Sequence, residues 1–532
     1  MPVWPKSFHT FGINLKTAST EWKLRHARTA PGQQKTVFET LIPPLAKATY
    51  WRAAGLAPGM KYSDFRSSMP VSTHAGLTPQ IERMRRGEAD VLWPGRCDLF
   101  ALTSGTAGTR KLIPVTDALL QHFRYAGLES LLYYTVRVRH AGAFRGRHLL
   151  GGSATTLVKL DRPELAPNHP GFAGDISGVT ALTLPEWAER HLYEPGGTAA
   201  KISDWESRLE AIAARTETRD ITLIAALPTW GLTLAHFLRD RWSKPNRRIR
   251  NLQGHWPNLE CFVHTGVSIA PFADELRDVF GSGVTFHEVY AATECIIGSQ
   301  DTANGRSLRV MADAGVFFEF LPLKDYDEKR LPELGAKALP LAEVAEGIDY
   351  VVLVTTPGGL VRYVLGDVVR FTSTQPPRLL QVGRTDLRLN AFGENISERE
   401  ITQALVAVCA THGWKIVNFH VAPQTSVRDF SRGQTGRHEW WIELRSGTLV
   451  TPTGVAMAGH LDAELRRMSE TYDLRRAAAV LDPPVVRLVM PGIFKHWMHF
   501  AKKLGGQHKI PRCTTDRTIA QELASITNFA ED

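Results

Sequence analysis

Hydrophobic residues along roughly the first 370 positions alternate between short continuous runs and longer stretches in which they recur every three or four residues. The run LECFVHTG (259–266) predicts a strand, and APFADELRDVFG (270–281) predicts a helix that ends at Gly281. VTFHEVYA (284–291) predicts a second strand. A strand, a helix and a strand in this order predict a βαβ unit with parallel strands.

An antiparallel section is expected further along the chain. The apolar segments IDYVVLVTT (348–356) and LVRYVLGDVVRFT (360–372) flank a Pro-Gly-Gly turn and predict a hairpin. Together with the alternation of strands and helices before it, this pattern predicts a large α/β domain of mostly parallel layers plus an antiparallel β section.

The chain restarts as a smaller α+β unit after LLQVGRTD (379–386). Ser397 followed by Glu400 three residues later predicts a capped helix start. Strands are then expected at 415–421, 438–444 and 485–490, with helices near 461–468 and at the end of the chain. We therefore predict an N-terminal domain over 1–385 and a small, mobile C-terminal domain over 386–532, joined at Asp386.

Composition fits a soluble globular protein of more than one domain, with 532 residues of which 43% are hydrophobic and 22% charged. The net charge is +9, but the basic residues form no runs or tails and no nucleic-acid-binding motif occurs, so nucleic acid is not an expected partner. Five dispersed cysteines favour reduced thiols in the cytoplasm. The best apolar run, 221–237, contains a proline and a glycine and is too short to span a membrane.

SGTAGTRK (104–111) has the composition of a phosphate-binding loop. It departs from the Walker pattern, because no Ser or Thr follows Lys111 and the next helix begins only at Asp117. The loop is therefore expected to join two strands, with glycines that allow backbone amides to converge on an anion. A Gly/Ser/Thr turn at a sheet edge has the same composition. The loop alone also leaves open a kinase, a nucleotide switch and an enzyme that consumes ATP to activate another molecule.

Three further stretches add candidate nucleotide contacts. YAATE (290–294) follows a parallel strand and so emerges at the carboxyl end of the sheet, where ligands bind. Tyr290 offers an aromatic face to a purine, and Glu294 offers a carboxylate to Mg²⁺. Asp367, between apolar residues in YVLGDVV, has acceptor oxygens for ribose hydroxyls. A plain strand end and a turn aspartate are the structural alternatives. The third stretch, GRTDLRLNAFGENIS (383–397), spans the expected domain junction.

This ordered set resembles the adenylate-forming superfamily, which activates carboxylic acids as acyl-adenylates. Within it, the chain is most similar to the acyl acid amido synthetases that conjugate auxin, jasmonate or benzoates to amino acids. VHTGVSIAPFADEL followed by YAATECIIG looks like the adenine-site region of that family, and GGQHKIPRC (505–513) is similar to its terminal signature. The resemblance runs from about Leu99 to Arg512, which is nearly the whole chain.

The resemblance implies a role for each matched position. Lys509 would be the mobile catalytic lysine, and Asp386 the hinge. Glu294 would hold Mg²⁺. The residues implied in ATP binding are Ser104, Gly105, Thr106, Gly108 and Lys111 at the phosphates, Gly266, Val267, Ser268 and Tyr290 at the adenine, Thr293 at the α-phosphate, and Asp367 and Arg384 at the ribose.

The predicted activity is ATP- and Mg²⁺-dependent activation of a small carboxylic acid, followed by acyl transfer to an amine, expected to be an amino acid. An acyl-coenzyme A ligase shares the first half-reaction and is the alternative, although Asn390 stands where such ligases often carry lysine. A third reading is an inactive nucleotide-binding scaffold. It is disfavoured because every charged position matched to the family, from Lys111 to Lys509, carries the expected type of residue. The chemistry needs no protein nucleophile, and no GxSxG elbow occurs. We expect a monomer.

Overall fold

The computed structural model describes residues 6–26, 30–103, 111–151, 155–162, 170–246, 248–266, 269–303, 307–385, 388–394, 396–426, 435–445, 452–501 and 509–527. Contacts divide the chain into two units. The first comprises 1–104, 110–267 and 275–381, and the second comprises 105–109, 268–274 and 382–532. The predicted junction residue Asp386 lies outside the described residues, so its role stays a prediction.

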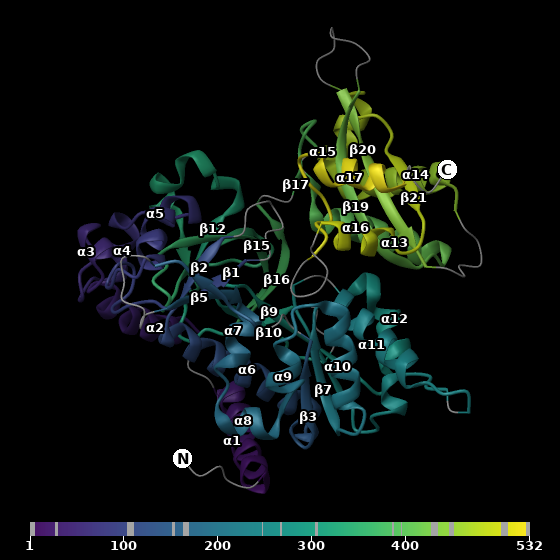
Figure 1. Cartoon of the computed structure of the whole chain (residues 1–532). Helices are drawn as coiled ribbons and strands as arrows, with labels where there is room; N and C mark the ends of the chain where they lie inside the picture. The colour runs from purple at the N-terminus through teal and green to yellow at the C-terminus, as the bar shows by residue number, and fades with distance from the viewer. Residues whose placement is uncertain are drawn as a thin grey trace. The chain divides into compact units, whose positions relative to one another are not determined.

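A large mixed sheet organises the first unit (Figure 1). Across the sheet the strands follow the order β13 (Leu339–Pro340), β12 (Phe317–Pro322), β14 (Asp349–Thr355), β15 (Tyr363–Thr374), β16 (Pro377–Arg384), β11 (Leu308–Val310), β10 (Ile296–Ser299), β9 (Thr285–Ala291), β8 (Cys261–His264), β7 (Ile221–Ala226), β3 (Arg147–Leu150) and β6 (Tyr193–Glu194).

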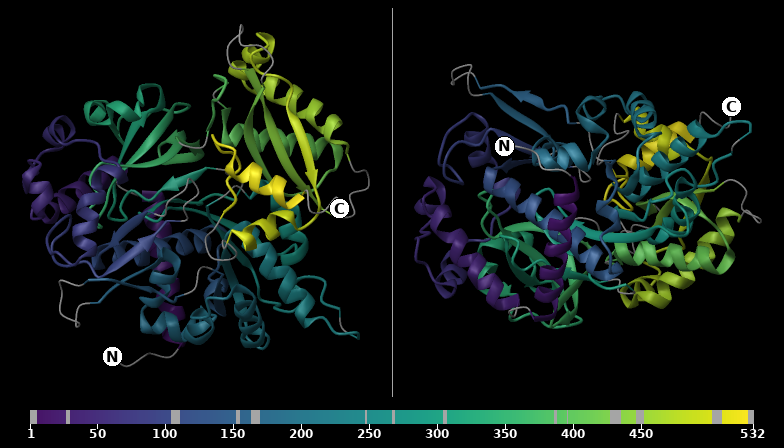
Figure 2. Two further views of the ribbon diagram at one scale, coloured as in Figure 1. Left: turned by 45° about the horizontal axis from the view of Figure 1, so that its top comes forward. Right: turned by 90° about the horizontal axis from the view of Figure 1, so that it is seen from below.

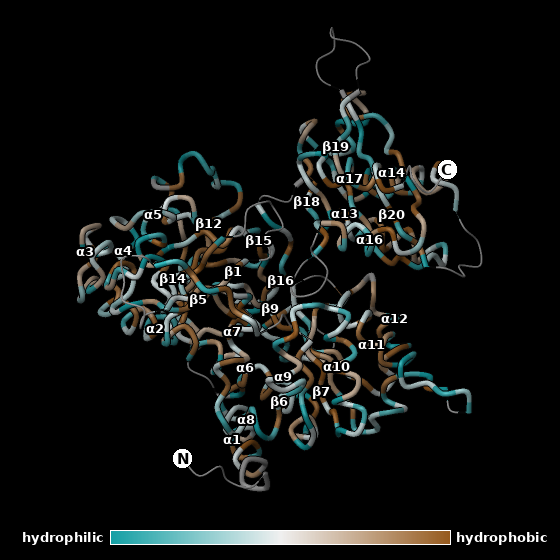
Figure 3. The backbone as a smooth tube through the Cα atoms, viewed as in Figure 1, coloured by the Kyte–Doolittle hydropathy of each residue, from teal (hydrophilic) through white to brown (hydrophobic). Residues whose placement is uncertain are grey.

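The sheet is parallel at one end only. Strands β6, β3, β7, β8 and β9 are parallel, whereas β9–β10, β10–β11, β11–β16, β12–β13, β12–β14 and β14–β15 pair antiparallel. The α/β class with an antiparallel section is thus confirmed, and the antiparallel section takes more of the sheet than the pattern indicated. Strands β12 and β14 are each buried except at one terminal residue, and such continuously buried strands resemble parallel strands in a sequence. Both strands run largely brown in Figure 3.

The predicted βαβ unit is present as β8, the helix α12 (Ala273–Phe280) and β9. Gly281 ends the helix with φ +117°, a backbone conformation that favours glycine. The other α-helices described in the first unit of the chain are α1 (Lys6–His26), α2 (Ala30–Leu45), α3 (Thr49–Ala53), α4 (Tyr62–Ser68), α5 (His74–Arg85), α6 (Asp117–Val138), α7 (Ile176–Leu182), α8 (Glu186–His191), α9 (Gly196–Ala200), α10 (Trp205–Thr216) and α11 (Pro228–Trp242).

Helix α6 begins at the predicted residue and holds α1 along its side. The side chain of Thr116 caps its first turn by accepting from the backbone of Leu119. The hydroxyls of Thr17 and Thr135 lie 3.0 Å apart, and Lys23 Nζ lies 2.8 Å from Glu129 Oε1. Figure 2 shows α1 as a straight purple helix. No helix of the described residues combines the length and the apolarity needed to cross a bilayer.

A second, smaller sheet of the first unit contains the two strands that flank the candidate phosphate loop in the sequence. Its order is β2 (Leu112–Val115), β1 (Leu99–Leu102), β5 (Gly171–Asp175) and β4 (Val158–Leu160). Strands β1 and β2 are antiparallel neighbours in sequence. The residues between them therefore connect two strands, as predicted.

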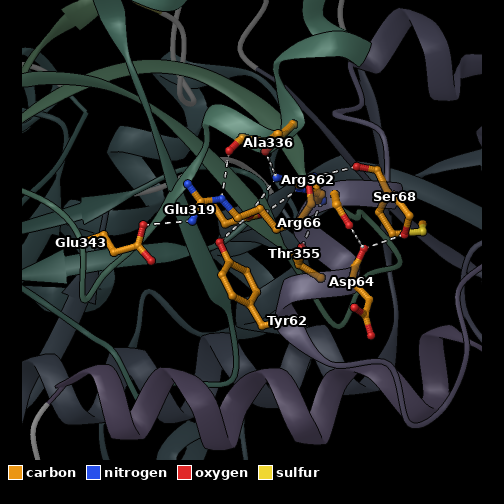
Figure 4. Close-up of polar contacts among 12 residues, drawn as sticks. Tyr62, Asp64, Arg66, Ser68, Glu319, Ala336, Glu343, Thr355 and Arg362 are labelled. Carbon is orange, nitrogen blue, oxygen red and sulfur yellow. Dashed lines mark hydrogen bonds and ion pairs between the residues drawn. The ribbon is translucent and has the colours of Figure 1, made fainter.

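A fully buried ion pair cross-links the N-terminal helices of this unit to the large sheet (Figure 4). Arg362 donates from Nε and Nη2 to the two carboxylate oxygens of Glu319 on β12, each at 2.9 Å. Its remaining N–H groups donate to the carbonyls of Arg66, Met69 and Gly335 at 2.9, 2.7 and 2.6 Å. The guanidinium thus uses all five donors inside the protein.

The second unit is α+β, as predicted. Its three-stranded sheet has the order β19 (Ile416–Ser426), β20 (Thr435–Leu444) and β21 (Val485–Val489), and β17 (Arg388–Leu389) pairs with β18 (Ile396–Ser397). Ser397 and Glu400 form the predicted capping box at the start of α13 (Glu398–His412). The remaining helices are α14 (Gly454–Met468), α15 (Glu470–Ala477), α16 (Ile493–Phe500) and α17 (Thr518–Thr527).

Candidate active site

The base of the candidate phosphate loop is closed by a pair of hydrogen bonds. The backbone N–H of Thr103 donates to the carbonyl of Lys111 at 3.0 Å, and the N–H of Lys111 donates to Thr103 Oγ1 at 3.1 Å. The loop therefore leaves and returns at one point of the sheet edge. Four predicted phosphate-binding residues lie outside the described residues, namely Ser104, Gly105, Thr106 and Gly108.

Lys111 is exposed at the end of this loop, close to the first turn of α5. His74 of that turn lies with Nε2 3.2 Å from the carbonyl oxygen of Leu112. Burial, together with the positive charge of Lys111, lowers the pKa of His74, so this imidazole is neutral at physiological pH. The sequence offered no signal for His74, because its proximity to the loop depends on the fold.

The carboxyl ends of the parallel strands meet at one edge of the large sheet. Ala226 ends β7 and His264 ends β8, and Glu288 stands level with them inside β9, before the last residue of that strand, Ala291. Gly266 follows β8 with φ +85°, which favours a residue without a Cβ. Tyr290 is the last residue but one of β9 and lies near the same edge. The predicted adenine residues Val267 and Ser268 lie outside the described residues.

Glu288 is a half-buried carboxylate at this edge that sequence reasoning missed. It shares a face of β9 with Tyr290, because side chains two residues apart in a strand point the same way. Burial raises the pKa of Glu288 to about 7. The only sequence signal was a charged residue inside an otherwise strand-like run.

Thr293 and Glu294 form the tip of the hairpin that joins β9 to β10. The N–H of Ala292 donates to the carbonyl of Cys295 at 2.8 Å and closes this tip. The structure therefore holds both predicted residues in one tight turn. Glu294 is only 7% exposed, so its negative charge is largely removed from water.

Tyr290 and Asp367 are in direct contact. The Tyr290 hydroxyl donates to Asp367 Oδ2 at 2.6 Å, and both side chains are buried. Burial raises the pKa of the Cys295 thiol, and the negative charges of Glu294 and Asp367 raise it further. The carboxylates of Glu294 and Asp367 therefore both lie near the Cys295 thiol. Three residues predicted to bind the nucleotide or its Mg²⁺, namely Tyr290, Glu294 and Asp367, are thus close together in the first unit.

The arrangement fits a Mg²⁺ ion that is shared with a phosphate ligand. Among the described residues, no group of three or more His, Cys, Asp or Glu side chains could hold a metal by itself. Mg²⁺ commonly takes one or two carboxylates and completes its shell with water and phosphate oxygens. Glu294 suits that mode of binding, because its carboxylate is buried at the carboxyl edge of the sheet.

The second unit holds Lys509 at the start of a segment anchored along β19. His420 Nδ1 lies 2.8 Å from the Pro511 carbonyl, and the N–H of Val421 donates to the Arg512 carbonyl at 2.9 Å. Arg512 Nη1 also donates to Asn418 Oδ1 at 2.6 Å. The KIPRC sequence is thus tied down immediately after Lys509, which is itself half-buried.

Arg384 ends strand β16 and is half-buried, and Asn390 follows β17. Both are described as part of the second unit. Their predicted roles toward the ribose and the acceptor stay predictions.

Known proteins resemble the chain over almost its full length. Indole-3-acetic acid-amido synthetase GH3.8 of Oryza sativa subsp. indica is 26% identical, with 92% of this chain and 89% of that protein aligned. Indole-3-acetic acid-amido synthetase GH3.3 of Arabidopsis thaliana is 22% identical, with 92% and 91% aligned.

Solved structures share the fold. The acyl acid amido synthetase AtGH3.15 in complex with 2,4-DB matches with a TM-score of 0.76 at 18% identity, covering 99% of this chain and 97% of that one. A 2-hydroxyisobutyryl-CoA ligase in the postadenylation state matches with a TM-score of 0.56 at 14% identity, covering 93% and 91%.

Three domain models of one protein family match successive segments of the chain. The models of the N-terminal, central and C-terminal domains of the GH3 family match residues 23–155, 309–384 and 399–518 in the same order. Together they cover more than half of the sequence, and the buried hairpin tip at Glu294 lies between the first two matches. The chain therefore belongs to the GH3 family.

Proposed function

We propose that this protein activates a small carboxylic acid with ATP and transfers the acyl group to the amine of an amino acid. One observation carries the proposal. The hairpin tip with Thr293 and Glu294 lies at the carboxyl edge of the sheet, next to Tyr290 and its hydrogen-bond partner Asp367. The names of the relatives support it, since they are amido synthetases for indole-3-acetic acid or acyl acids. Five buried free cysteines support a reducing, cytoplasmic setting. We take the protein to act as a monomer.

The first half-reaction forms a bond between a carboxylate oxygen of the acid and the α-phosphorus of ATP. The bond from that phosphorus to the bridging oxygen of the β-phosphate breaks, and pyrophosphate leaves with the electron pair. In the second half-reaction the amine nitrogen attacks the acyl carbon, AMP leaves, and the nitrogen loses a proton. No covalent bond to the protein is needed, so the protein acts by positioning and by neutralising charge.

Each described residue has a definite task in this scheme. The Tyr290 ring offers a face to the adenine, while its hydroxyl fixes the carboxylate of Asp367 for the ribose hydroxyls. Thr293 donates to the α-phosphate, and Lys111 contributes positive charge at the end of the phosphate loop. Glu294 would hold Mg²⁺, which supplies positive charge to the phosphate oxygens. Lys509 supplies a further cation near the bond that forms.

An acyl-coenzyme A ligase is the second candidate function. The observation in its favour is the shared fold with a 2-hydroxyisobutyryl-CoA ligase. Such an enzyme would share the adenylation step and differ in the acceptor, which would be a thiol. Matches to all three GH3 domain models favour the amine acceptor.

Pyrophosphate exchange and product analysis test the proposal together. With Mg²⁺, ATP and a panel of carboxylic acids, we expect acid-dependent incorporation of labelled pyrophosphate into ATP. Adding a mixture of amino acids should then yield an acyl-amino acid by mass spectrometry. Release of ADP in place of AMP would refute adenylation. A thioester formed only with coenzyme A would establish the ligase instead.

A pivot at Asp386 is a further part of the proposal, supported by its place in the stretch that resembles the hinge of the superfamily. A large change in φ and ψ at one residue would let Lys509 serve adenylation and then leave room for the acceptor. Proline fixes φ near −65°, so Asp386→Pro should slow one half-reaction far more than the other. Stopped-flow measurement of each half-reaction checks this, and equal effects on both would exclude the pivot.

A further inference from the structure

The hairpin that carries Thr293 and Glu294 contains an irregularity directly after its tip. Ile296 pairs with Ala291, but the next pair joins Gly298 to Tyr290, so Ile297 is an extra residue on β10. Such a bulge disrupts the ladder locally and often re-aims a strand near a functional site. The N–H of Ile296 consequently donates to a side chain from another element, namely to His122 Nε2 at 2.9 Å.

His122 lies on the second turn of α6 and is 4% exposed. Its other ring nitrogen, Nδ1, lies 2.5 Å from the carbonyl oxygen of Ala314. A carbonyl can only accept, so Nδ1 must carry the proton, and an N–H can only donate, so Nε2 must be bare. The two contacts therefore select one neutral tautomer. Burial lowers the pKa of His122 to about 4, which keeps the ring in that state near neutral pH.

Helix α6 connects this contact to β2, the strand that follows the candidate phosphate loop in the sequence. The helix begins directly after β2, the strand that leaves the phosphate loop, and its cap residue Thr116 donates from Oγ1 to the carbonyl of Pro357 at 2.6 Å. One rigid helix is thus fixed at its start and reaches the hairpin tip through His122. A shift of the ring would move Ile296 and, two residues before it, Glu294.

We propose that His122 is a positioning residue that fixes the Thr293–Glu294 tip by accepting a hydrogen bond from the Ile296 amide. This inference rests on the proposed function, because the tip matters only if it binds Mg²⁺ and ATP. It adds a buried residue of the N-terminal part of the chain to the determinants of metal affinity. Groups that orient a metal ligand typically change affinity or activity by about 10–100-fold when they are removed.

Two amide substitutions at His122 distinguish the effect of its hydrogen bond to Ile296 from the general effect of changing a buried polar side chain. Asparagine keeps a donor near the position of Nδ1 and loses the acceptor toward Ile296, whereas glutamine keeps an acceptor near the position of Nε2 and loses the donor toward Ala314. Each variant therefore loses one hydrogen bond. We expect His122→Asn to raise the half-saturating Mg²⁺ concentration about 10–100-fold, and His122→Gln to stay within about threefold of the wild type.

Binding and exchange measurements supply readouts that do not depend on turnover. Mn²⁺ binding in the presence of ATP, followed by electron paramagnetic resonance, should weaken in His122→Asn, and amide hydrogen exchange in the peptide around Ile296 should accelerate. As a control, His148→Asn alters a buried histidine on β3, whose Nε2 lies 3.0 Å from the Ala143 carbonyl. That variant should lose stability without changing the Mg²⁺ requirement.

Each outcome decides the inference. The inference would be overturned if His122→Asn and His122→Gln had the same half-saturating Mg²⁺ concentration. It would also be overturned if the rise in that concentration were simply proportional to the stability that each variant loses. If neither variant folds, ¹⁵N chemical shifts of the wild-type imidazole remain decisive, since protonation at Nε2 would exclude the contact. Failure of wild-type pyrophosphate exchange with every acid would instead refute the proposed function, which keeps the two failures distinct.

Discussion

Replacing Lys509 by alanine is expected to slow adenylation by about 10²–10³-fold, or ~3–4 kcal/mol of transition-state stabilisation. Negative charge builds up on the α-phosphate and on the departing pyrophosphate, and a correctly placed ammonium group stabilises that charge more in the transition state than in the ground state. Acid-dependent pyrophosphate exchange measures the step directly.

The same variant should fold normally, because residues that follow Lys509 make the hydrogen bonds that hold its segment along β19. Contacts along β19 include those of the backbone carbonyls of Pro511 and Arg512 and of the Arg512 side chain. Lys495→Ala on α16 is a matched control, since it removes an exposed lysine from the same unit. Wild-type exchange in Lys509→Ala, or an equal loss in Lys495→Ala, would contradict the assigned role.

Replacing Arg362 by methionine is expected to destabilise the first unit by about 3–5 kcal/mol, because it leaves a buried carboxylate without its partner. The side chains of Arg362 and Glu319 are 0% and 1% exposed, so water cannot take over the lost hydrogen bonds. Calorimetry should show a lower unfolding temperature for the first unit.

Two companion variants show whether burial is the cause. Arg370→Met removes a pair with Asp349 in which the side chains are 45% and 28% exposed, and it should cost at most about 1 kcal/mol. The double variant Arg362→Met with Glu319→Leu removes both buried charges and should recover much of the loss. Equal destabilisation by Arg362→Met and Arg370→Met would refute this account of the pair.

Sequence reasoning predicted those features that depend on local pattern. In the unit β8–α12–β9, the spacing of hydrophobic residues changes clearly between strand and helix, and a glycine ends the helix. The capping box at Ser397 is a signal contained in four residues. The hairpin of β14 and β15 was marked by its Pro-Gly-Gly turn. For Tyr290, Thr293, Glu294 and Asp367 the resemblance to a known family supplied the roles, and the structure brings these residues close together.

The features that escaped prediction depend on contacts between distant residues. His122 lies in a helix in which a buried histidine looks like any other polar residue, and its partners are 174 and 192 positions away. Arg362 and Glu319 are 43 positions apart, and nothing in either segment marks them as a pair. The extent of the antiparallel section was underestimated because buried antiparallel strands have the same continuous apolar runs as parallel ones.

The burial of all five cysteines makes this chain suitable for site-selective thiol labelling. Burial raises the pKa of Cys97 and of Cys409 to about 12 in each case, so these thiols carry little of the reactive thiolate near neutral pH. Thr40 on α2 and Ala463 on α14 are exposed and belong to different units. Cysteines introduced there would accept a donor and an acceptor dye without removal of the native thiols. Single-molecule energy transfer could then follow the distance between the two units during turnover.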